Sequence, residues 1–346
     1  YFSTFELCRF TPQVRMCEPK GDGISSFSDL LGSTVLRVFV WIVGATTCLA
    51  NLVVLVCRMM LYEERNVPTM FIKNLAVSDF LMGVFLLNVG AHDLLYRGHY
   101  NRYAFSWMGS WDCQTGGILA MLSSEASILI LTVMSVERYL VVAFPYQWKG
   151  LTMRTALMLM AAIWTITLAL SFTPLIPVDM LYDFYGSNGV CFPLHIHDPF
   201  MTGYQYSALI FLGINGTAFV IMLVCYFGMF CSIRRTQHLS GRKVDMSISK
   251  RLFLLVFTDA LCWVPIMVIK TLAFAQIHIT DEFYAWLAIF VLPVNSSLNP
   301  ILYSISTPAF KRNLHDHMPD RLISISKRSW NSNCLLASAA PWGKTS

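Results

Sequence analysis

The stretch RLFLLVFTDALCWVPIMVIKTLAFA, residues 251–275, is mostly apolar and carries Cys262-Trp263-Val264-Pro265 near its middle. An earlier apolar stretch ends in Glu137-Arg138-Tyr139, and a later one ends in Asn299-Pro300-Ile301-Leu302-Tyr303. Polar and helix-breaking residues are costly in a hydrocarbon interior, where every backbone group needs a partner within the protein. Their presence predicts a bundle of helices that changes shape to carry a signal across a membrane.

Composition around that stretch is also that of a membrane protein. Of the 346 residues, 55% are hydrophobic and 13% are charged, with a net charge of +5. Soluble domains carry about a quarter charged residues. The chain begins without methionine, and its first thirty residues hold no apolar stretch of the signal-peptide type. We therefore expect Tyr1 to be a cut into a longer protein with more extracellular sequence before it.

Seven apolar segments are long enough to cross a bilayer, which takes roughly twenty helical residues each. They are 35–57, 69–91, 113–142, 154–174, 204–231, 251–275 and 283–304. The predicted fold is an all-α membrane protein, a seven-transmembrane helix bundle. A short amphipathic helix is expected after the seventh span, from the pattern Phe310-Lys311-Arg312.

Basic residues set the expected orientation, because they are retained on the cytoplasmic side. They are concentrated in the loops 58–68, 143–153 and 232–250, whereas the opposite loops hold Arg97 and Arg102. We expect a multi-pass protein of the plasma membrane with an extracellular N-terminus and a cytoplasmic C-terminus. Three parts follow from this: an extracellular hinge at 1–34, the bundle at 35–304 and a cytoplasmic tail at 305–346.

Cysteines fall into groups by position. Five lie in apolar segments and are expected to be unpaired: Cys48, Cys57, Cys225, Cys231 and Cys262. Four lie where an oxidising exterior allows disulfides, namely Cys8, Cys17, Cys113 and Cys191. Cys334 is in the tail.

Motifs for catalysis are missing, so no enzyme activity and no cofactor other than a sodium ion are expected. The sequence has no nucleophile elbow, no His-Glu-x-x-His pair and no phosphate-binding Gly-x-x-x-x-Gly-Lys loop. The pairs His195/His197 and His315/His317 are more simply solvated histidines than metal ligands. No nucleic-acid partner is expected.

Six ionisable residues lie within the apolar segments: Asp79, Glu125, Glu137, Arg138, Asp259 and Lys270. An unpaired charge costs several kcal/mol there, so each should face the bundle interior and have a partner. One alternative is a set of interhelical hydrogen bonds that only orders the helices. Their combination with the three motifs above favours a signalling role instead.

Motifs at these positions resemble those of the rhodopsin-like G-protein-coupled receptors over about 35–320. They occur once each and in order: Asn51, Asn74-Leu75-Ala76-Val77-Ser78-Asp79, Cys113, Glu137-Arg138-Tyr139, Trp164, Cys191, Tyr226, Cys262-Trp263-x-Pro265 and Asn299-Pro300-x-x-Tyr303.

A narrower resemblance is to the relaxin-type leucine-rich-repeat receptors. It rests on Cys8 with Cys17-Glu18-Pro19, Asp22-Gly23-Ile24-Ser25-Ser26, Asp29-Leu30-Leu31, 185–194, 257–263 and Leu292-Pro293-Val294-Asn295-Ser296. One departure is Arg138, where relaxin receptors tend to have lysine. Another feature shared with these receptors is Ala218, which stands where most rhodopsin-like receptors have a proline.

The resemblance implies roles for single residues. Cys113 and Cys191 are expected to form a disulfide that pins the second outer loop over the mouth of the bundle. Residues expected to couple to the G protein or to switch are Glu137, Arg138, Tyr139, Tyr226, Asp245, Asn299, Pro300 and Tyr303. Arg138 is expected to contact Asp245 in the inactive state, although Asp245 could also be a simple loop charge.

Further roles concern the middle and outer parts of the bundle. Asp259, Trp263 and Pro265 form the expected activation relay, with Asp259 bonded to Asn299. Residues matching a sodium site are Asp79, Ser127, Asn295 and Ser296, and water bridging the same groups is the alternative. Lys270 either faces a ligand or extends to the lipid headgroups.

Other functions fit less well. A retinal-binding light receptor needs a lysine in the seventh span, and 283–304 has none. Inverted repeats or a polar pore, typical of transporters and channels, are not visible. The hinge pattern argues against a receptor for a small molecule. The expected function is a receptor for an extracellular peptide or protein hormone, most simply of the insulin–relaxin kind. It would act through a heterotrimeric G protein, with adenylyl cyclase as the expected effector.

Overall fold

In the computed structural model, described residues are 24–60, 66–176, 181, 184–193, 203–240, 246–275 and 291–302. All regular elements in this part of the chain are helices. The long ones are α2 (Thr34–Met60), α3 (Val67–Tyr96), α5 (Trp111–Ala143), α6 (Met153–Phe172), α8 (Asn215–Ser240) and α9 (Met246–Phe274). Short elements are α4 (Tyr100–Met108), η1 (Thr173–Leu175), η3 (Tyr185–Ser187), α7 (Tyr204–Ala208), η4 (Leu209–Ile214) and α11 (Leu292–Pro300).

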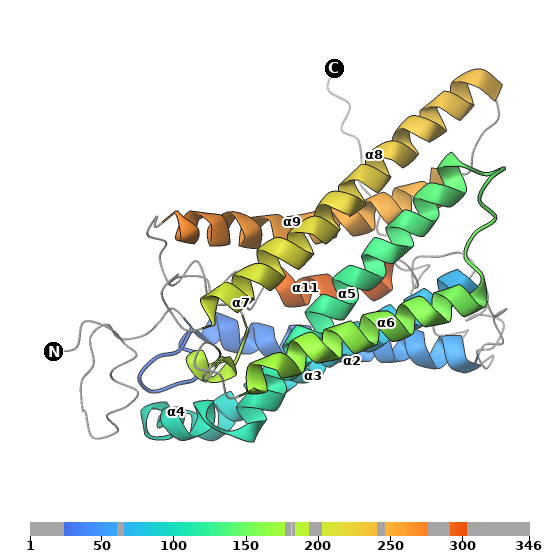
Figure 1. The fold of residues 1–346 in the computed structure, drawn as a ribbon. Coiled ribbons are helices and arrows are strands. Elements are labelled where there is room, and N and C mark those ends of the chain that lie inside the picture. Colours follow the sequence, from blue (N-terminus) through green and yellow to red (C-terminus); the bar gives the residue numbers. More distant parts are fainter. Residues whose placement is uncertain are drawn as a thin grey trace, which may run out of the picture.

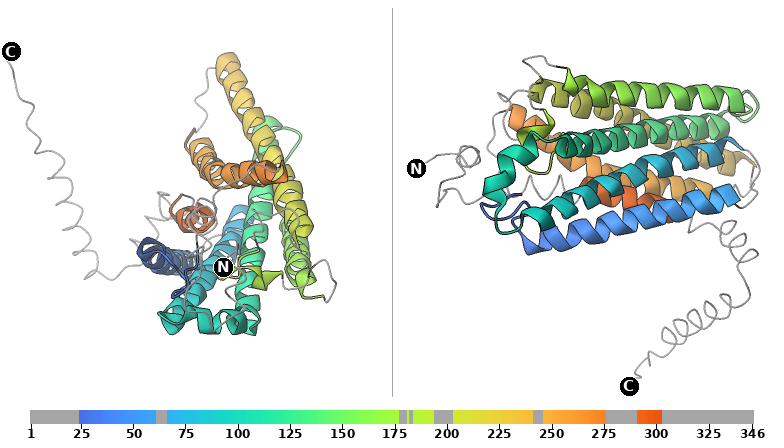
Figure 2. Two further views of the ribbon diagram at one scale, coloured as in Figure 1. Left: turned by 90° about the vertical axis from the view of Figure 1, so that its left-hand side faces the viewer. Right: turned by 90° about the horizontal axis from the view of Figure 1, so that it is seen from below.

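Five of the predicted spans are confirmed as helices long and apolar enough to cross a membrane. They cover Thr34–Met59, Val67–Tyr96, Trp111–Ala143, Met153–Leu175 and Tyr204–Arg235. The sixth predicted span corresponds to α9, and α11 lies within the seventh, part of which is outside the described residues. The long helices form one bundle (Figure 2), in which α5 and α8 are tilted relative to α2, α6 and α9 (Figure 1). The observed architecture is therefore the expected helical bundle.

Side-chain caps explain where three of the helices begin. Asn66 Oδ1 accepts a hydrogen bond from the Thr69 amide at 2.9 Å, next to a proline in the first turn of α3. Ser110 Oγ accepts from the Cys113 amide at the start of α5, and Thr152 Oγ1 accepts from the Thr155 amide at the start of α6. These side chains satisfy backbone donors that have no partner inside the helix.

Helix α5 is the centre of the bundle. It packs against α3, α6 and α8, and most of its apolar stretch is buried, whereas only about a third of the apolar stretches of α2 and α6 is buried. Helix α11 packs against α2, α3 and α9. The exposed apolar sides of α2, α6 and α8 are those expected of helices that face lipid.

The fifth span contains a π-helical turn, η4, between α7 and α8. A π turn accommodates one extra residue and is a common cause of a bulge in a helix. The bulge forms although Ala218, four residues beyond η4, stands where a proline is usual. The irregular outer part of this span therefore does not depend on a proline.

Two segments at one end of the bundle were not predicted. Helix α4 lies between the second and third predicted spans, 69–91 and 113–142, where a loop was expected. Residues 24–33, which we call the strap, lie against the bundle, with Ile24, Leu30 and Leu31 buried. The backbone amides of Tyr100 and Asn101 donate to the carbonyls of strap residues 28 and 27. We call this end, where α2 begins and α4 lies (Figure 1), the outer end.

Candidate functional site

Asp79 joins three helices in the middle of the bundle. Its carboxylate, fully buried on α3, accepts hydrogen bonds from Ser127 Oγ of α5 at 3.3 Å and from Asn299 Nδ2 of α11 at 2.9 Å. Asn295 and Ser296, also predicted for a sodium site, are buried one turn earlier on α11. The structure thus brings Asp79 and Ser127 together and adds Asn299, which the sequence had assigned to the switch.

Two further pairs of polar residues join neighbouring helices. Asn51 Nδ2 of α2 donates to the backbone carbonyl of Ser296 at 3.1 Å. Trp164 Nε1 of α6 donates to Asn74 Oδ1 of α3 at 2.9 Å. All four residues belong to the motifs and segments from which the resemblance was drawn. In this structure they act as interhelical contacts, and hydrogen bonds of this kind contribute about 0.6 kcal/mol each on average inside a membrane.

The end of α5 carries the Glu137-Arg138-Tyr139 triplet. Arg138 Nε lies 3.4 Å from Glu137 Oε2 in a partly exposed ion pair. Tyr139 packs on Gly228 of α8, where a side chain would collide with its ring, and its ring meets Phe144 edge-on. Tyr226 of α8 is half-buried beside the core. Asp245 and Tyr303 lie outside the described residues, so the contact between Arg138 and Asp245 stays a prediction.

Trp263 and Pro265 lie inside α9, as expected. Trp263 is buried, and its ring lies 6.0 Å from that of Phe211 in η4. Pro265 interrupts the helix interior, which permits a kink. Pro300 is buried at the end of α11. The side chain of Asp259 is outside the described residues, so its predicted bond to Asn299 also stays a prediction.

Glu125 faces the bundle interior and has a hydrogen-bond partner, as expected for an ionisable residue inside a span. Its side chain, 0% exposed in the middle of α5, accepts a hydrogen bond through Oε1 from Asn215 Nδ2 of α8 at 2.9 Å. Asn215 begins the pattern Asn215-Gly216-Thr217, which matches a glycosylation site, but its burial inside a span places it out of reach of glycosylation. Asn215 as the partner of Glu125 was not foreseen.

Lys270 does not extend to the headgroups. Its side chain is 0% exposed, and Nζ donates to Ser207 Oγ of α7 at 2.8 Å. Nζ also lies 4.9 Å from the ring centre of Tyr204 and 5.6 Å from that of Phe211. The snorkelling alternative is therefore wrong, because this lysine points across to the fifth span.

The predicted disulfide between Cys113 and Cys191 is present, with Cα atoms 5.4 Å apart. It fixes residues 184–193, which we call the loop tip, over the start of α5. A side chain at Gly117 would collide with the Tyr185 ring and would approach the Cys191 carbonyl to 2.6 Å, so glycine permits this close seat. The five cysteines predicted to be unpaired form no disulfide with any described residue: Cys48, Cys57, Cys225, Cys231 and Cys262.

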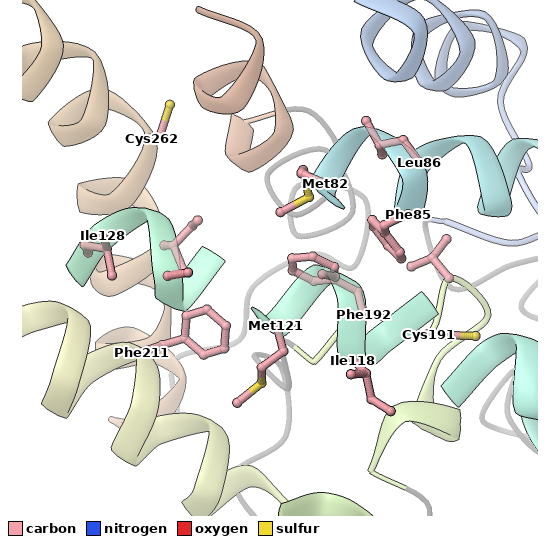
Figure 3. Packing of buried hydrophobic residues seen from close by; sticks show 14 of the residues in the cluster. Met82, Phe85, Leu86, Ile118, Met121, Ile128, Cys191, Phe192, Phe211 and Cys262 are labelled. Carbon is pink, nitrogen blue, oxygen red and sulfur yellow. The ribbon is translucent and has the colours of Figure 1, made fainter. Parts of the chain in front are cut away.

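The loop tip fills the outer mouth of the bundle. Phe192 is buried between α3 and α5, near Phe85 and Met121 (Figure 3), with its ring centre 5.7 Å from that of Phe85. Tyr185 donates its hydroxyl to the Ser171 carbonyl at 2.7 Å, and burial raises the pKa of this phenol well above its ordinary value. Trp107 Nε1 of α4 donates to the Gly189 carbonyl at 2.7 Å.

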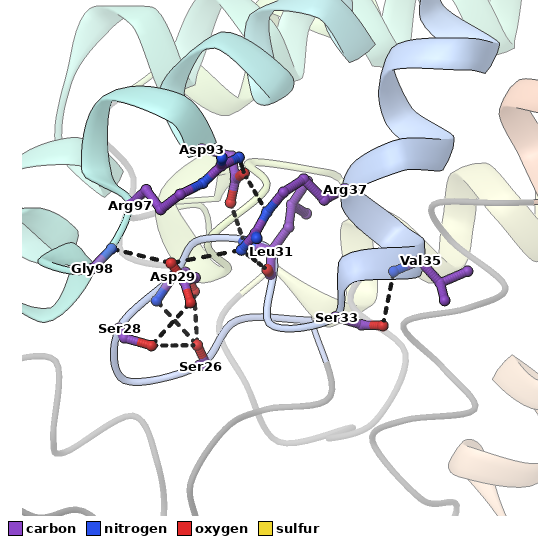
Figure 4. Close-up of polar contacts among 10 residues, drawn as sticks. All are labelled: Ser26, Ser28, Asp29, Leu31, Ser33, Val35, Arg37, Asp93, Arg97 and Gly98. Atoms are coloured by element: carbon purple, nitrogen blue, oxygen red, sulfur yellow. Dashed lines mark hydrogen bonds and ion pairs between the residues drawn. The ribbon is translucent and has the colours of Figure 1, made fainter.

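Asp93 connects the strap to the bundle, a role that sequence reasoning missed (Figure 4). Its carboxylate is 0% exposed near the end of α3 and accepts from the Leu31 amide at 2.8 Å, Arg37 Nε at 2.9 Å and Arg97 at 3.1 Å. Arg37 also donates to the Leu31 carbonyl at 3.1 Å. The available signal was the spacing of Asp93 and Arg97, which places the two on one helix face.

No group of three or more histidine, cysteine, aspartate or glutamate side chains in the described part of the chain is arranged to hold a metal. The histidines that the sequence analysis considered lie outside that part.

Comparison with known proteins agrees with this geometry. Residues 50–303 match the family described as 7 transmembrane receptor (rhodopsin family). The crystal structure of squid rhodopsin superposes with a TM-score of 0.62 at 19% identity, covering 83% of this chain and 85% of that one. This likeness concerns the fold.

Among curated relatives, relaxin receptor 1 of Mus musculus is 43% identical over 321 residues, 91% of this chain and 42% of that receptor. Relaxin receptor 2 of Homo sapiens is 41% identical over 345 residues, 96% of this chain and 46% of that receptor. The chain spans less than half the length of these relatives. Its motifs, its helices and the family match together show a multi-pass membrane protein that belongs to the rhodopsin family of seven-transmembrane receptors.

Proposed function

We propose that this chain is the membrane bundle of a receptor for a peptide or protein hormone of the insulin–relaxin kind. The hormone would be captured by an ectodomain that precedes the strap. Occupancy would open the inner face of the bundle, so that Arg138 and residues 232–250, most of which belong to the end of α8 and the start of α9, engage a heterotrimeric G protein. Adenylyl cyclase is the proposed effector. The proposed orientation puts the N-terminus outside the cell and the C-terminus in the cytoplasm.

The similarity to relaxin receptors 1 and 2 over more than nine-tenths of the chain carries this proposal. The outer mouth supports it independently. Phe192 and Cys191 of the loop tip are buried where a small ligand would otherwise enter between the helices. A receptor for a small molecule or for a different peptide is the alternative, and it would require this loop to move aside.

The switch is proposed to lie between Arg138 and the inner part of the sixth span. The ion pair of Arg138 with Glu137 is partly exposed, and such pairs contribute about 1 kcal/mol or less. A weak restraint suits two states that differ by a few kcal/mol, because a ligand with a modest preference can then shift the population. Trp263 and Pro265, with Asp259, are the proposed relay from the outer half of the bundle.

The experiment is a second-messenger assay on the full-length receptor in cells, with a panel of insulin–relaxin peptides and both cAMP and calcium readouts. A cAMP response to one peptide is expected, and Arg138→Ala should abolish it while leaving hormone binding intact. Silence in both readouts, with the receptor shown at the surface, contradicts the proposed hormone class. Normal signalling by Arg138→Ala removes this residue from the mechanism.

A sodium ion is also proposed at Asp79. The oxygen atoms of Asp79 and Ser127 are ligands that suit a hard cation, and buried Asn295 and Ser296 are on the adjoining helix. The purified receptor should melt at a higher temperature in NaCl than in choline chloride, and Asp79→Asn should remove the difference. Equal melting temperatures in both salts would favour bridging water instead.

A further inference from the structure

Lys270 and Ser207 form a link between two spans and a loop. Lys270 Nζ donates to Ser207 Oγ at 2.8 Å, and Ser207 Oγ in turn donates to the Pro193 carbonyl at 3.1 Å. A hydroxyl can accept and donate at the same time, so the two bonds are compatible. The sixth span, the fifth span and the loop tip are thereby joined through one buried oxygen atom.

Each end of this link is attached to an element with its own fixed contacts. Pro193 follows Cys191, whose disulfide to Cys113 holds the loop tip on α5. On the other side, Tyr204 donates its hydroxyl to the Lys270 backbone carbonyl at 3.3 Å. Lys270 is therefore held by both its side chain and its backbone to the same turn of α7.

Lys270 lies on the part of α9 that follows Pro265, so the link can affect the angle of this helix. Pro265 interrupts the helix five residues before Lys270, so the two parts of α9 on either side of it can change their mutual angle. Phe211 is near both Lys270 Nζ and Trp263, with the Trp263 ring centre 6.0 Å away. Phe211 thus connects Lys270 with Trp263, which belongs to the proposed relay.

Burial makes these bonds consequential. Lys270 and Ser207 are both fully buried, where the loss of one partner leaves a polar group without the water that would replace it. A lysine in this position needs a reason, because apolar residues fill space inside a bundle at a lower cost. The link to the loop tip supplies that reason.

We propose that Lys270 is a positioning residue that couples the loop tip to the outer part of α9 through Ser207. Displacement of the loop tip is transmitted to Ser207, then to Lys270, and so to the angle at Pro265. The hydrogen-bonded link sets how strongly an event at the outer mouth biases the sixth span. This inference rests on the proposed signalling function, which it extends to a defined contact.

The test uses four single variants of the full-length receptor and the double variant that combines Lys270→Met with Ser207→Ala. Lys270→Met removes the donor and keeps the length, Lys270→Arg keeps donors, and Ser207→Ala removes the acceptor. Thr271→Ala is the matched control, because Thr271 is exposed on the same helix and its hydroxyl bonds to Met267 within that helix. Basal and hormone-evoked cAMP, hormone binding and surface expression are measured for each.

Lys270→Met and Ser207→Ala are each expected to raise the EC50 by about tenfold, within the range of coupling between sites, with hormone affinity of the ectodomain unchanged. The double variant should be no worse than either single one, and Lys270→Arg should retain most of the response. Additive shifts in the double variant, or wild-type basal and evoked signalling by Lys270→Met, would overturn the proposal. If Lys270→Met fails to reach the cell surface, the response of Ser207→Ala decides the test, because this variant removes the same hydrogen bond from the fifth span.

A second measurement separates this inference from the hormone assignment. Melting temperatures of the purified receptor and the same single and double variants form a double-mutant cycle that needs no hormone. Non-additive losses with no response to any insulin–relaxin peptide would support the link and contradict the hormone class. Additive losses in a receptor that does respond would contradict the link alone.

Discussion

Asp93 and Glu125 are both wholly buried carboxylates, yet their surroundings differ. Asp93 at the outer end accepts from a backbone amide and from two arginines. Glu125 in the middle of the bundle accepts from the neutral amide of Asn215, and its Oε2 has no hydrogen-bond partner among the described residues. The outer end is therefore built as a fixed clamp, whereas the interior contains polar contacts that can be exchanged at lower cost.

Replacing Asp93 by alanine should have the largest effect. The change leaves the Arg37 guanidinium and the Leu31 amide without their shared acceptor, and breaking a buried ion pair costs about 3–5 kcal/mol. We expect loss of surface expression and a lower melting temperature. Asp112→Ala is the control, because that carboxylate is 72% exposed. Equal behaviour of the two variants would mean that Asp93 is not a clamp.

Asn215→Leu should have the next largest effect. It removes the donor to Glu125 and leaves the carboxyl buried without a partner, which costs about 1–3 kcal/mol. The melting temperature of the purified receptor measures this loss. Thr217→Ala should be neutral, since Thr217 is exposed and its hydroxyl bonds to Gly213 within the helix. A neutral Asn215→Leu variant would show that the pair contributes nothing to stability.

Matched isosteric changes sharpen the comparison itself. Glu125→Gln keeps an oxygen that can accept from Asn215, whereas Asp93→Asn removes the negative charge that faces two guanidinium groups. Hydrogen bonds to charged groups contribute about 1.5–3 kcal/mol and neutral ones about 1 kcal/mol. Asp93→Asn should therefore lower the melting temperature more than Glu125→Gln. The reverse order would remove the distinction drawn between the two sites.

Arg97→Ala should have the smallest effect. The Arg97 side chain is 42% exposed, so its ion pair with Asp93 is screened by solvent and contributes about 1 kcal/mol or less. Arg37→Ala is the informative partner variant, because Arg37 is 20% exposed and also holds the Leu31 carbonyl. Melting temperatures of both variants, measured at low and high salt, should fall further for Arg37→Ala at each salt concentration.

Much of the fold could be predicted from the sequence, because hydrocarbon length and hydropathy act locally along the chain. The five spans fully within described residues begin and end within about five residues of the predicted bounds, and the disulfide and the burial of Asp79 and Glu125 are as expected. Asp93 was missed because hydropathy ends the second segment at residue 91, whereas α3 continues to Tyr96.

The direction of Lys270 could not be predicted for a different reason. Its height along the helix follows from its distance in sequence from Trp263, but the neighbour it faces depends on how α9 is rotated against the fifth span. That rotation is set by packing between segments distant in sequence. The packing of the strap could not be predicted for the same reason. Its polar composition indicated a linker, whereas Leu30 and Leu31 are buried against residues that are distant in the sequence.

The π-helical turn η4 has a consequence for the angular phase of the fifth span. Ser207 precedes the turn and Asn215 follows it, yet both face inward, toward Lys270 and Glu125 respectively. Each residue advances an α-helix by about 100°. Deleting one residue from 209–214 would thus rotate everything before the gap by roughly a quarter turn, so that one of the two inward contacts is lost while the other survives. The one extra residue in the π turn therefore allows Ser207 and Asn215, at different depths of the same span, both to face the bundle interior.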